Sequence, residues 1–395
     1  MLSFQLSNTT IALLIATILP TLFLLTIYRM RVASIAKHAR KCQDSAPIEK
    51  LPPISVIVYT CNDSDNLAQM LPNVLNQHYT SDFEVIVVND GASESTKDIV
   101  SALSANFPNL YLTYTPDDSR FLSRKKLALT LGIKAARHDY VVITKSSCRI
   151  DSLNWLKSMA QHFANGKDVV IGHASYSPAD DKAFGTRSRA FNAAVDATTH
   201  LAAAIGAHPY RGFDANIAYS RKLFFDNRGF SNSLNLKFGD DDIFISEIAT
   251  PSNTAVELSP DAHVTCVYRR KPKIVYRDLK MRYMFTSRHL YHGSRRLFGL
   301  ASTMMWAWLL LSIAAIASSL ASLHQLIISA SAVTIISLAL WLPLIFTWRR
   351  TLKSLQSRPM LLTIPAYLLA RPLHNFYFYL RSLATRKWNY TWQNP

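Results

Sequence analysis

Three adjacent carboxylates are the strongest candidate for chemistry in this sequence. Asp240, Asp241 and Asp242 follow a glycine and precede the apolar run Ile243-Phe244-Ile245. Adjacent carboxylates repel one another unless a charged or protic group lies nearby, so such a triplet needs partners. A carboxylate that stays ionised can accept a proton as a general base. The other interpretation is a helix N-terminus, where aspartates interact favourably with the helix dipole, and both can hold together.

Four short apolar runs, rich in β-branched residues, alternate with segments of helical pattern. The expected strands are Ile54–Thr60, Phe83–Asp90, Leu110–Thr115 and Asp139–Thr144, and the expected helices are Asn66–Gln77, Ser95–Phe107 and Ser123–Ala136. Strands separated by helices indicate right-handed crossovers and a parallel sheet. The sequence therefore predicts an α/β fold with a mostly parallel sheet.

The residues directly after these strands are candidates for binding, because a ligand of such a sheet lies beyond the carboxyl ends of its strands. They include Asp63, Asp90 and the run Lys145-Ser146-Ser147. A carboxylate at a strand end can accept hydrogen bonds from a ligand. The alternatives are structural: Asp63 can cap the helix that begins near Asn66, and Asp90-Gly91 is a common turn dipeptide.

The composition excludes several classes of protein. Of 395 residues, 49% are hydrophobic and 17% are charged, against roughly 25% charged in an average soluble chain, so the chain is not intrinsically disordered. The four cysteines have no C-x-x-C spacing for zinc or redox chemistry. The net charge of +17 comes from basic residues that crowd beside apolar runs. We therefore expect anionic membrane lipids, and no nucleic acid, as their partner.

Two parts of the chain are apolar enough to span a membrane. Residues 1–28 carry no charge, and the basic stretch after them indicates an uncleaved anchor followed by a basic linker at 29–50. Residues 298–348 contain no Lys, Arg, Asp or Glu, which predicts a transmembrane hairpin with its turn at 322–325. Because basic residues follow the anchor and flank both ends of the hairpin, the intervening segment is expected in the cytosol.

The C-terminal segment 349–395 is basic, and its apolar stretch 360–380 carries Arg371 and His374 near the middle. A charge at the centre of a bilayer costs at least a few kcal/mol on an isolated helix. We therefore expect an interfacial or re-entrant element here. A further membrane span is the alternative.

Between about residues 51 and 288 the sequence resembles, in order, the motifs of family 2 glycosyltransferases with a GT-A fold. ISVIVYTCNDSDNL is similar to the first strand and turn of that family, and EVIVVNDGASEST to its second strand and nucleotide-binding aspartate. SRKKLALTLGIKAARHDYVVIT resembles the segment that leads to the metal motif. The acceptor-side segment and the acidic cluster of the family are resembled by YRGFDANIAYSRKLFFDNRGF followed by GDDDIF. The resemblance depends on all of these motifs occurring in the order of the family. It extends to bacterial polysaccharide and lipid-linked glycan transferases.

The resemblance implies a GT-A domain over residues 51–266 that moves a sugar from a nucleotide-sugar donor to a hydroxyl of a lipid-linked or glycan acceptor. It implies inversion at the sugar and a multi-pass protein of a bacterial-type inner membrane, with this domain in the cytosol. It assigns the general base to Asp241, with Asp242 as the next choice and Asp240 as the third member of the cluster. We expect the loops that leave the sheet to form one pocket that holds both Asp90 and Asp241.

The same resemblance assigns Asp90 to the nucleotide and Lys125 to the donor diphosphate, and Asp63 is a further candidate for binding the nucleotide. A lysine suits a diphosphate because its ammonium forms charge-assisted hydrogen bonds with phosphate oxygens. The alternative for Lys125 and its neighbour Lys126 is the solvated face of a helix with one basic and one apolar side.

Residues 267–297 resemble the amphipathic interfacial helix of the family's membrane-bound members. Those members carry a Gln-x-x-Arg-Trp motif, of which only Arg282 is present, with Leu279 and Tyr283 at the other two positions. Arg282 is expected to contact the diphosphate or the acceptor. Its alternative is a side chain that extends to the headgroups at the membrane surface.

The sequence departs from the family at the metal motif. Lys145 and Ser147 stand where an Asp-x-Asp pair is expected to hold Mg or Mn, and a protonated lysine cannot coordinate a hard cation, which prefers oxygen ligands. Three outcomes are open. Lys145, with Arg149, neutralises the diphosphate; other groups, such as the cluster Asp240–Asp242, hold the metal; or the chain is an inactive homologue that serves as a binding or scaffold protein in a membrane glycan-assembly complex.

Overall fold

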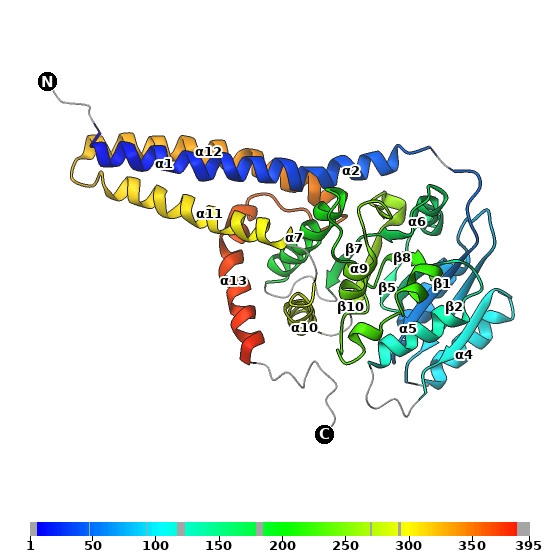
Figure 1. Ribbon diagram of the computed structural model, residues 1–395. Coiled ribbons are helices and arrows are strands. Elements are labelled where there is room, and N and C mark those ends of the chain that lie inside the picture. Colours follow the sequence, from blue (N-terminus) through cyan, green and yellow to red (C-terminus); the bar gives the residue numbers. More distant parts are fainter. Residues whose placement is uncertain are drawn as a thin grey trace.

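The computed structural model describes residues 6–46, 48–91, 93–116, 123–178, 185–268, 271–290 and 294–384 (Figure 1). In this part of the chain an α/β domain lies at one end of a bundle of long helices that extends away from it. The predicted C-terminal segment 349–395 lies outside the described residues from position 385 on.

The domain is built on a sheet of seven strands in the described residues, in the order β3-β2-β1-β4-β8-β6-β9. The strands are β1 Ile54–Thr60, β2 Phe83–Asn89, β3 Leu110–Tyr114, β4 Tyr140–Lys145, β6 Val169–Ile171, β8 Ile217–Ser220 and β9 Thr254–Val256. Only β8 runs antiparallel to its two neighbours, β4 and β6, among these described strands. The predicted α/β fold with a mostly parallel sheet is therefore confirmed.

Helices cover both faces of this sheet, as a parallel sheet with buried strands requires. Val56 and Val58 of β1 point to the face covered by α3 Ser64–Leu75, α4 Glu94–Ser104 and α6 Trp155–Ala164. Ile57 points to the opposite face, which is covered by α5 Arg124–Ala135, α8 Arg221–Asp226 and α9 Asp242–Ile248. This alternation follows from the two-residue period of a strand.

The register of the central strands places the predicted binding residues side by side. Thr60 of β1 pairs with Asn89 of β2, and Tyr59 pairs with Lys145 of β4. The loops that carry Asp63 and Asp90 therefore leave the sheet at the same edge as Lys145. A smaller sheet lies beside this edge and is formed by β5 Cys148–Arg149, β10 Val264–Tyr268 and β7 Ala174–Pro178. Short 3-10 turns span Ser231–Ser233 and Pro260–Ala262.

Three helices in the described residues are long and apolar enough to cross a membrane. They are α1 Asn8–Ile27 with its continuation to Gln43, α11 Ser294–Ala317, of which residues from Gly299 qualify, and α12 Leu323–Ser354. They lie side by side over much of their length (Figure 1). Thr10 of α1 forms a hydrogen bond of 2.8 Å with Ser318, directly after α11. The hairpin turn lies at 318–322, slightly before the predicted turn.

The segment 29–50, which the sequence predicts as a basic linker, is helical as far as Gln43. A π-helical turn, Tyr28–Val32, joins α1 to α2, Ala33–Gln43. Ile35 and Ala39 are buried in the core of the α/β domain, because they recur at helical spacing on one face. His38 adds a hydrogen bond of 2.8 Å from Nε2 to the carbonyl of Val256.

Helix α7, Thr186–Ile205, joins the domain to the long helices. Ala190 and Phe191 near its N-terminus pack in a cluster with α1, α11 and α12. Leu201 and Ala202 near its C-terminus pack in the core of the α/β domain. One helix therefore contributes to both cores, which couples the position of the sheet to that of the helix bundle.

The segment predicted as interfacial or re-entrant forms α13, Ile364–Ala384, and it is not among the three candidate spans. It packs against α7, α11 and α10, which spans Pro272–Thr286. Arg371 is paired there: its guanidinium lies 2.7 Å from Oδ1 of Asp196 and 3.0 Å from Oδ1 of Asn192. Asp196 also pairs with Lys280 of α10 at 2.5 Å. Arg371, whose charge would be costly in a membrane span on an isolated helix, is therefore paired with residues of the neighbouring helix α7.

Candidate active site

A cluster of three buried carboxylates lies at the edge of the sheet, formed by Asp214, Asp240 and Asp241. Their oxygens lie within 4.8 Å of one another. Asp214 comes just before β8, and Asp240 and Asp241 occupy the turn before α9. Gly239 makes this turn possible, because its φ of +106° favours glycine and a Cβ there would lie 2.5 Å from Ile243. The backbone amide of Asp214 donates a hydrogen bond of 3.2 Å to Asp241.

Three cations from three different elements match these three carboxylates. Lys125 of α5 contacts both Asp214 and Asp240. Lys145, the last residue of β4, lies 2.9 Å from the other oxygen of Asp214. Arg282 of α10 lies 2.6 Å from Asp241 and 3.2 Å from Asp240. Formal charge in the cluster is therefore balanced within the protein.

These ion pairs decide the protonation of the cluster. Burial alone would raise the pKa of Asp214, but the charges of Lys125, Lys145 and Arg282 outweigh burial and hold it well below its ordinary value. Burial likewise opposes ionisation of Asp241, and Arg282 in particular brings the pKa of that carboxyl below its ordinary value. Asp241 is therefore an ionised carboxylate at neutral pH, which is the state a general base requires.

Asp242 has different surroundings, although it is adjacent in sequence. Its carboxylate accepts hydrogen bonds from the Thr286 hydroxyl and from the amide of Ile243, the latter at 2.9 Å. Burial, together with the charge of Asp241, raises its pKa to about 7. Asp242 is thus held by α9 and α10, apart from the ion pairs of Asp240 and Asp241. The helix N-terminus and the acidic cluster are both present, as the sequence allows.

Asp90 is buried at the end of β2, where two side chains hold its carboxylate. The Tyr59 hydroxyl donates a hydrogen bond of 2.7 Å to Oδ2, and Nε of Arg124 lies 2.8 Å from Oδ1. Gly91 takes a positive φ of 113°, as the turn interpretation expects. The Lys125 ammonium lies over the Tyr59 ring, 5.5 Å from its centroid. Tyr59 therefore stands between Asp90 and the acidic cluster.

Asp63 ties the end of β1 to the loop after β4. It accepts hydrogen bonds of 2.8 Å from the Ser146 hydroxyl and from the Asn66 side chain. It occupies the N-cap position of α3, but its side chain makes no capping hydrogen bond to the backbone. The capping interpretation is therefore wrong for this side chain.

Neither Lys126 nor Arg282 lies at a surface, which was the alternative position for each of them. Lys126 is fully buried, and its ammonium donates to the Ser233 carbonyl, the Ser233 hydroxyl at 2.9 Å and the Leu236 carbonyl at 3.1 Å. Burial lowers its pKa to about 8. Its helix therefore lacks the single basic face expected from the sequence. Arg282 is 17% exposed and lies in the acidic cluster, so it is not a side chain that extends to a membrane surface.

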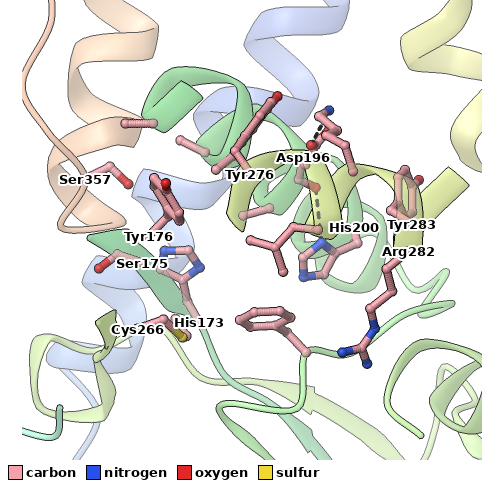
Figure 2. A pocket seen from close by; sticks show the side chains of 18 of the residues that line it. His173, Ser175, Tyr176, Asp196, His200, Cys266, Tyr276, Arg282, Tyr283 and Ser357 are labelled. Carbon is pink, nitrogen blue, oxygen red and sulfur yellow. Dashed lines mark hydrogen bonds and ion pairs between the residues drawn. The ribbon is translucent and has the colours of Figure 1, made fainter. Parts of the chain in front are cut away.

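Two cavities meet at Arg282. The larger, of about 530 Å³, lies beyond the ends of β1 and β4 and is lined by Tyr59, Asn62, Asp63, Lys145, Ser146, Ser147, Phe238 and Asp278, among others. The smaller, of about 110 Å³, is lined by Asp241 and by residues of α7, α10 and β7. Figure 2 shows His200 and Arg282 on one side of the smaller cavity, and His173, Ser175 and Tyr176 on the other.

The prediction of a single pocket that holds both Asp90 and Asp241 is wrong. Asp63 and Lys145 line the larger cavity, and Asp241 lines the smaller one. Asp90 lines neither of these two, because its carboxylate is directed at Tyr59 and Arg124. Arg282, with Leu279 and Tyr268, lines both cavities.

Asp214 is the residue that sequence reasoning missed. It belongs to the segment that resembles the acceptor side of the family, but its carboxylate was not a predicted site residue. The available signal was its position directly before the buried strand β8, where polar residues at a sheet edge face the ligand. Sequence reasoning also missed Arg124 and Tyr59. No signal in the sequence points to them, because only the fold brings them to Asp90.

The acidic cluster is the one group of described residues whose carboxylates are spaced to hold a metal ion. Mg and Mn prefer such oxygen ligands. Each carboxylate is already in contact with Lys125, Lys145 or Arg282. A divalent ion would have to displace them. The spacing of the three carboxylates fits a metal ion. The three cations already paired with them do not.

Comparison with known proteins agrees with this fold. Residues 55–229 match the family model described as Glycosyl transferase family 2. The probable glycosyltransferase YdaM of Bacillus subtilis (strain 168) is 29% identical over 119 residues, which cover 29% of this chain and 26% of that protein. The match thus spans about a quarter of the relative's length.

Among solved structures, the mannosyltransferase PcManGT from Pyrobaculum calidifontis, in complex with GDP-Man and Mn2+, superposes with a TM-score of 0.52 at 21% identity. The superposition covers 92% of this chain and 99% of that chain. S. aureus TarS 1-349, in complex with UDP-GlcNAc, covers 82% of this chain and 92% of that chain, with a TM-score of 0.42 at 15% identity. The first of these likenesses, with the family match, confirms the GT-A-like fold.

Proposed function

We propose, from the match of residues 55–229 to the model of Glycosyl transferase family 2, that this chain transfers a sugar from a nucleotide-sugar donor to a membrane-linked acceptor hydroxyl. The observation that carries the proposal is the arrangement around Arg282. This residue contacts the candidate base Asp241 at 2.6 Å and lines the two cavities that meet beside it.

The proposed reaction forms one glycosidic bond and breaks one sugar–phosphate bond. The acceptor oxygen attacks the anomeric carbon from the side opposite the diphosphate, which inverts that carbon. Its proton passes to the ionised carboxylate of Asp241. The electron pair of the broken bond leaves with the nucleoside diphosphate. Asp240 and Asp214 take no proton in this scheme, because they hold the cations in place.

The larger cavity is the proposed donor site. Its volume of about 530 Å³ lies within the range of roughly 300–1,000 Å³ that is usual for small-molecule sites. Asp63 and Asn62 line it near the end of β1, and Lys145 lines it at the end of β4. We assign the nucleoside to the Asp63 side and the diphosphate to the Lys145 side. Asp90 supports the donor site from behind, through Tyr59.

The smaller cavity is the proposed site of the acceptor hydroxyl. Ala190, Ala194 and Ala197 of α7 form part of its wall, and the first two also pack in the cluster with the apolar long helices. His173 and Arg211 line it with nitrogens, Nε2 and Nε, that have no hydrogen-bond partner among the described residues. These groups can bind acceptor hydroxyls. The position of the cavity next to the helix bundle supports a lipid-linked acceptor.

The three candidate spans support a membrane protein. We propose that the domain lies on the cytosolic side, as the basic flanks of the apolar segments indicate, and that residues 267–297 and α13 lie at the membrane surface. A bacterial-type inner membrane fits the predicted acceptor class.

A transfer assay with the purified full chain tests this function. The protein is incubated with labelled UDP- and GDP-sugars in two arms, one with membrane lipid extract and one with soluble oligosaccharides. We expect labelled product in the lipid arm. Asp241→Asn should lower turnover by about 10²–10⁴-fold while nucleoside diphosphate binding persists. Asp226→Asn, an exposed aspartate on α8, is the matched control and should keep full turnover.

An inactive binding or scaffold protein is the second candidate. The loss of the Asp-x-Asp carboxylates at Lys145 and Ser147 favours it. Turnover that is unaffected by Asp241→Asn would remove this residue from the mechanism. Absence of turnover with every donor, together with absence of nucleoside diphosphate binding, would favour the scaffold.

A further inference from the structure

We propose that Lys145 and Arg282 bind the donor diphosphate in place of a divalent cation, so that donor binding does not require a metal. This inference rests on the proposed function, since it names how the same donor site holds its ligand. It departs from the metal motif that the sequence resemblance leads one to expect.

Lys145 stands at the position where the first carboxylate of the metal motif is expected. It ends β4, pairs in register with Tyr59, and lines the larger cavity together with Ser146 and Ser147. Its ammonium lies 4.8 Å from the centroid of the Phe213 ring and 2.9 Å from Asp214. These contacts fix a long, flexible side chain at the cavity wall. An ammonium held in this way is a point charge with donors for phosphate oxygens.

Lys145 remains charged in this environment. Burial by itself would lower its pKa, but the charge of Asp214 outweighs burial and raises the pKa well above its ordinary value. Asp214 therefore acts as a positioning residue: it holds Lys125 and Lys145 through its two carboxylate oxygens.

Arg282 supplies the second cationic group. It reaches the cavity from α10, and its planar guanidinium presents several N–H donors in a fixed fork that matches phosphate oxygens. It contacts Asp241 and Asp240 through Nη2, at 2.6 and 3.2 Å. Lys145 and Arg282 therefore line the same cavity from two different elements, and Asp214 lies within 2.9 Å of the first and 3.5 Å of the second.

The charge balance of the cluster favours this assignment over a metal. Asp214, Asp240 and Asp241 are matched by Lys125, Lys145 and Arg282. A divalent cation would have to displace cations that are already paired with these carboxylates, and breaking buried ion pairs is costly. A diphosphate adds negative charge on the side where Lys145 and Arg282 border the cavity. A metal would therefore find each of these three carboxylates already paired, whereas a diphosphate in the cavity can bind the N–H donors of Lys145 and Arg282.

Binding of UDP and GDP to the full chain, measured by titration calorimetry in EDTA and in manganese, tests the inference. We expect the same affinity in both buffers. Lys145→Ala should weaken binding by about tenfold or more, and Lys145→Arg should restore part of it. Lys222→Ala, an exposed lysine on α8, is the control and should bind as the wild type does.

A double variant provides the converse test. Lys145→Asp with Ser147→Asp restores the two missing carboxylates, and we expect weak binding in EDTA that manganese restores. Electron paramagnetic resonance of free Mn2+ measures metal uptake directly: the wild-type chain should leave the signal unchanged, and the double variant should reduce it.

The outcomes separate the inference from the proposed function. Wild-type binding that requires manganese would overturn the inference and leave the proposed transferase intact. Equal binding in both buffers with no loss in Lys145→Ala would also overturn it. Failure of the folded wild-type chain to bind UDP or GDP in any buffer would overturn the proposed function, and the inference with it.

Discussion

The guanidinium of Arg282 lies 2.6 Å from Oδ1 of Asp241, at the point where the proposed donor and acceptor cavities meet. This pair joins α10 to the turn before α9, two segments that are far apart in the sequence. It keeps the candidate base ionised despite its burial, and it covers one of the two oxygens of that base. Transfer of Arg282 to the diphosphate would expose this oxygen to the acceptor hydroxyl.

Replacing Arg282 should move the acidic limb of the pH–rate profile. Burial raises the pKa of Asp241 and Arg282 lowers it, so Arg282→Gln leaves burial unopposed by that charge. Turnover at saturating donor should then fall at a pH about 1–3 units higher than in the wild type. Arg277→Gln, on the same helix and more exposed, should leave the limb in place. An unmoved limb in Arg282→Gln would show that Asp241 is not the titrating base.

Asp242→Asn should remove a pH dependence of stability. Because burial raises the pKa of Asp242 in the folded chain to about 7, the folded state holds a proton that the unfolded state releases. Stability is therefore highest below about pH 4 for this group and falls as the pH rises towards 7, by on the order of 4 kcal/mol. Thermal melts from pH 4 to 8 should show a flatter profile for the variant. A variant that keeps the wild-type slope would refute this account.

Arg371→Met should loosen α13 from the rest of the chain. Arg371 lies 2.7 Å from Asp196, which also pairs with Lys280 of α10. Removing one partner of a buried ion pair typically costs about 3 kcal/mol or more. We expect a lower melting temperature and faster proteolysis near residue 360. Arg381→Met, an exposed change on the same helix, should have no such effect, and equal melts for the two variants would contradict the pairing.

Asp63→Asn and Asp90→Asn should have different effects. Asp63 lines the proposed donor cavity, so its variant should weaken UDP or GDP binding by about tenfold with little change in melting temperature. Asp90 is held by Tyr59 and Arg124, so its variant should cost about 1–3 kcal/mol of stability. Calorimetry and thermal melts on both variants decide the roles. A large loss of affinity without loss of stability in Asp90→Asn would place Asp90 in direct contact with the nucleotide.

Local pattern was sufficient for the elements of the fold. The run Ile54–Thr60 is β1 with the bounds that its β-branched residues predict, and α3, α4 and α5 begin and end within three residues of their predicted limits. The apolar segments of α1, α11 and α12 were equally clear. These features depend on neighbours in sequence, namely on propensity and on the period of apolar residues. The missing Asp-x-Asp pair was also visible, since it is a matter of residue identity alone.

Residues with polar side chains were harder to place, because their environment comes from distant parts of the chain. Lys126 has the composition of a surface residue, but the loop at Ser233 and Leu236 supplies it with three acceptors and buries it. Arg371 looks costly on an isolated helix, but α7 supplies Asp196. The stretch 29–43 is rich in charge, yet two of its residues, Ile35 and Ala39, anchor it to the domain.

The sequence by itself determined which strands and helices form, which segments are apolar enough for a membrane, and that the usual metal ligands are absent. Only the tertiary structure decided that Lys125, Lys145 and Arg282 converge on Asp214, Asp240 and Asp241. These residues come from separate elements, and no local rule relates them. Burial raises the energy of each charge, so the folded chain has to bring an opposite charge to each one, and that requirement defines the site.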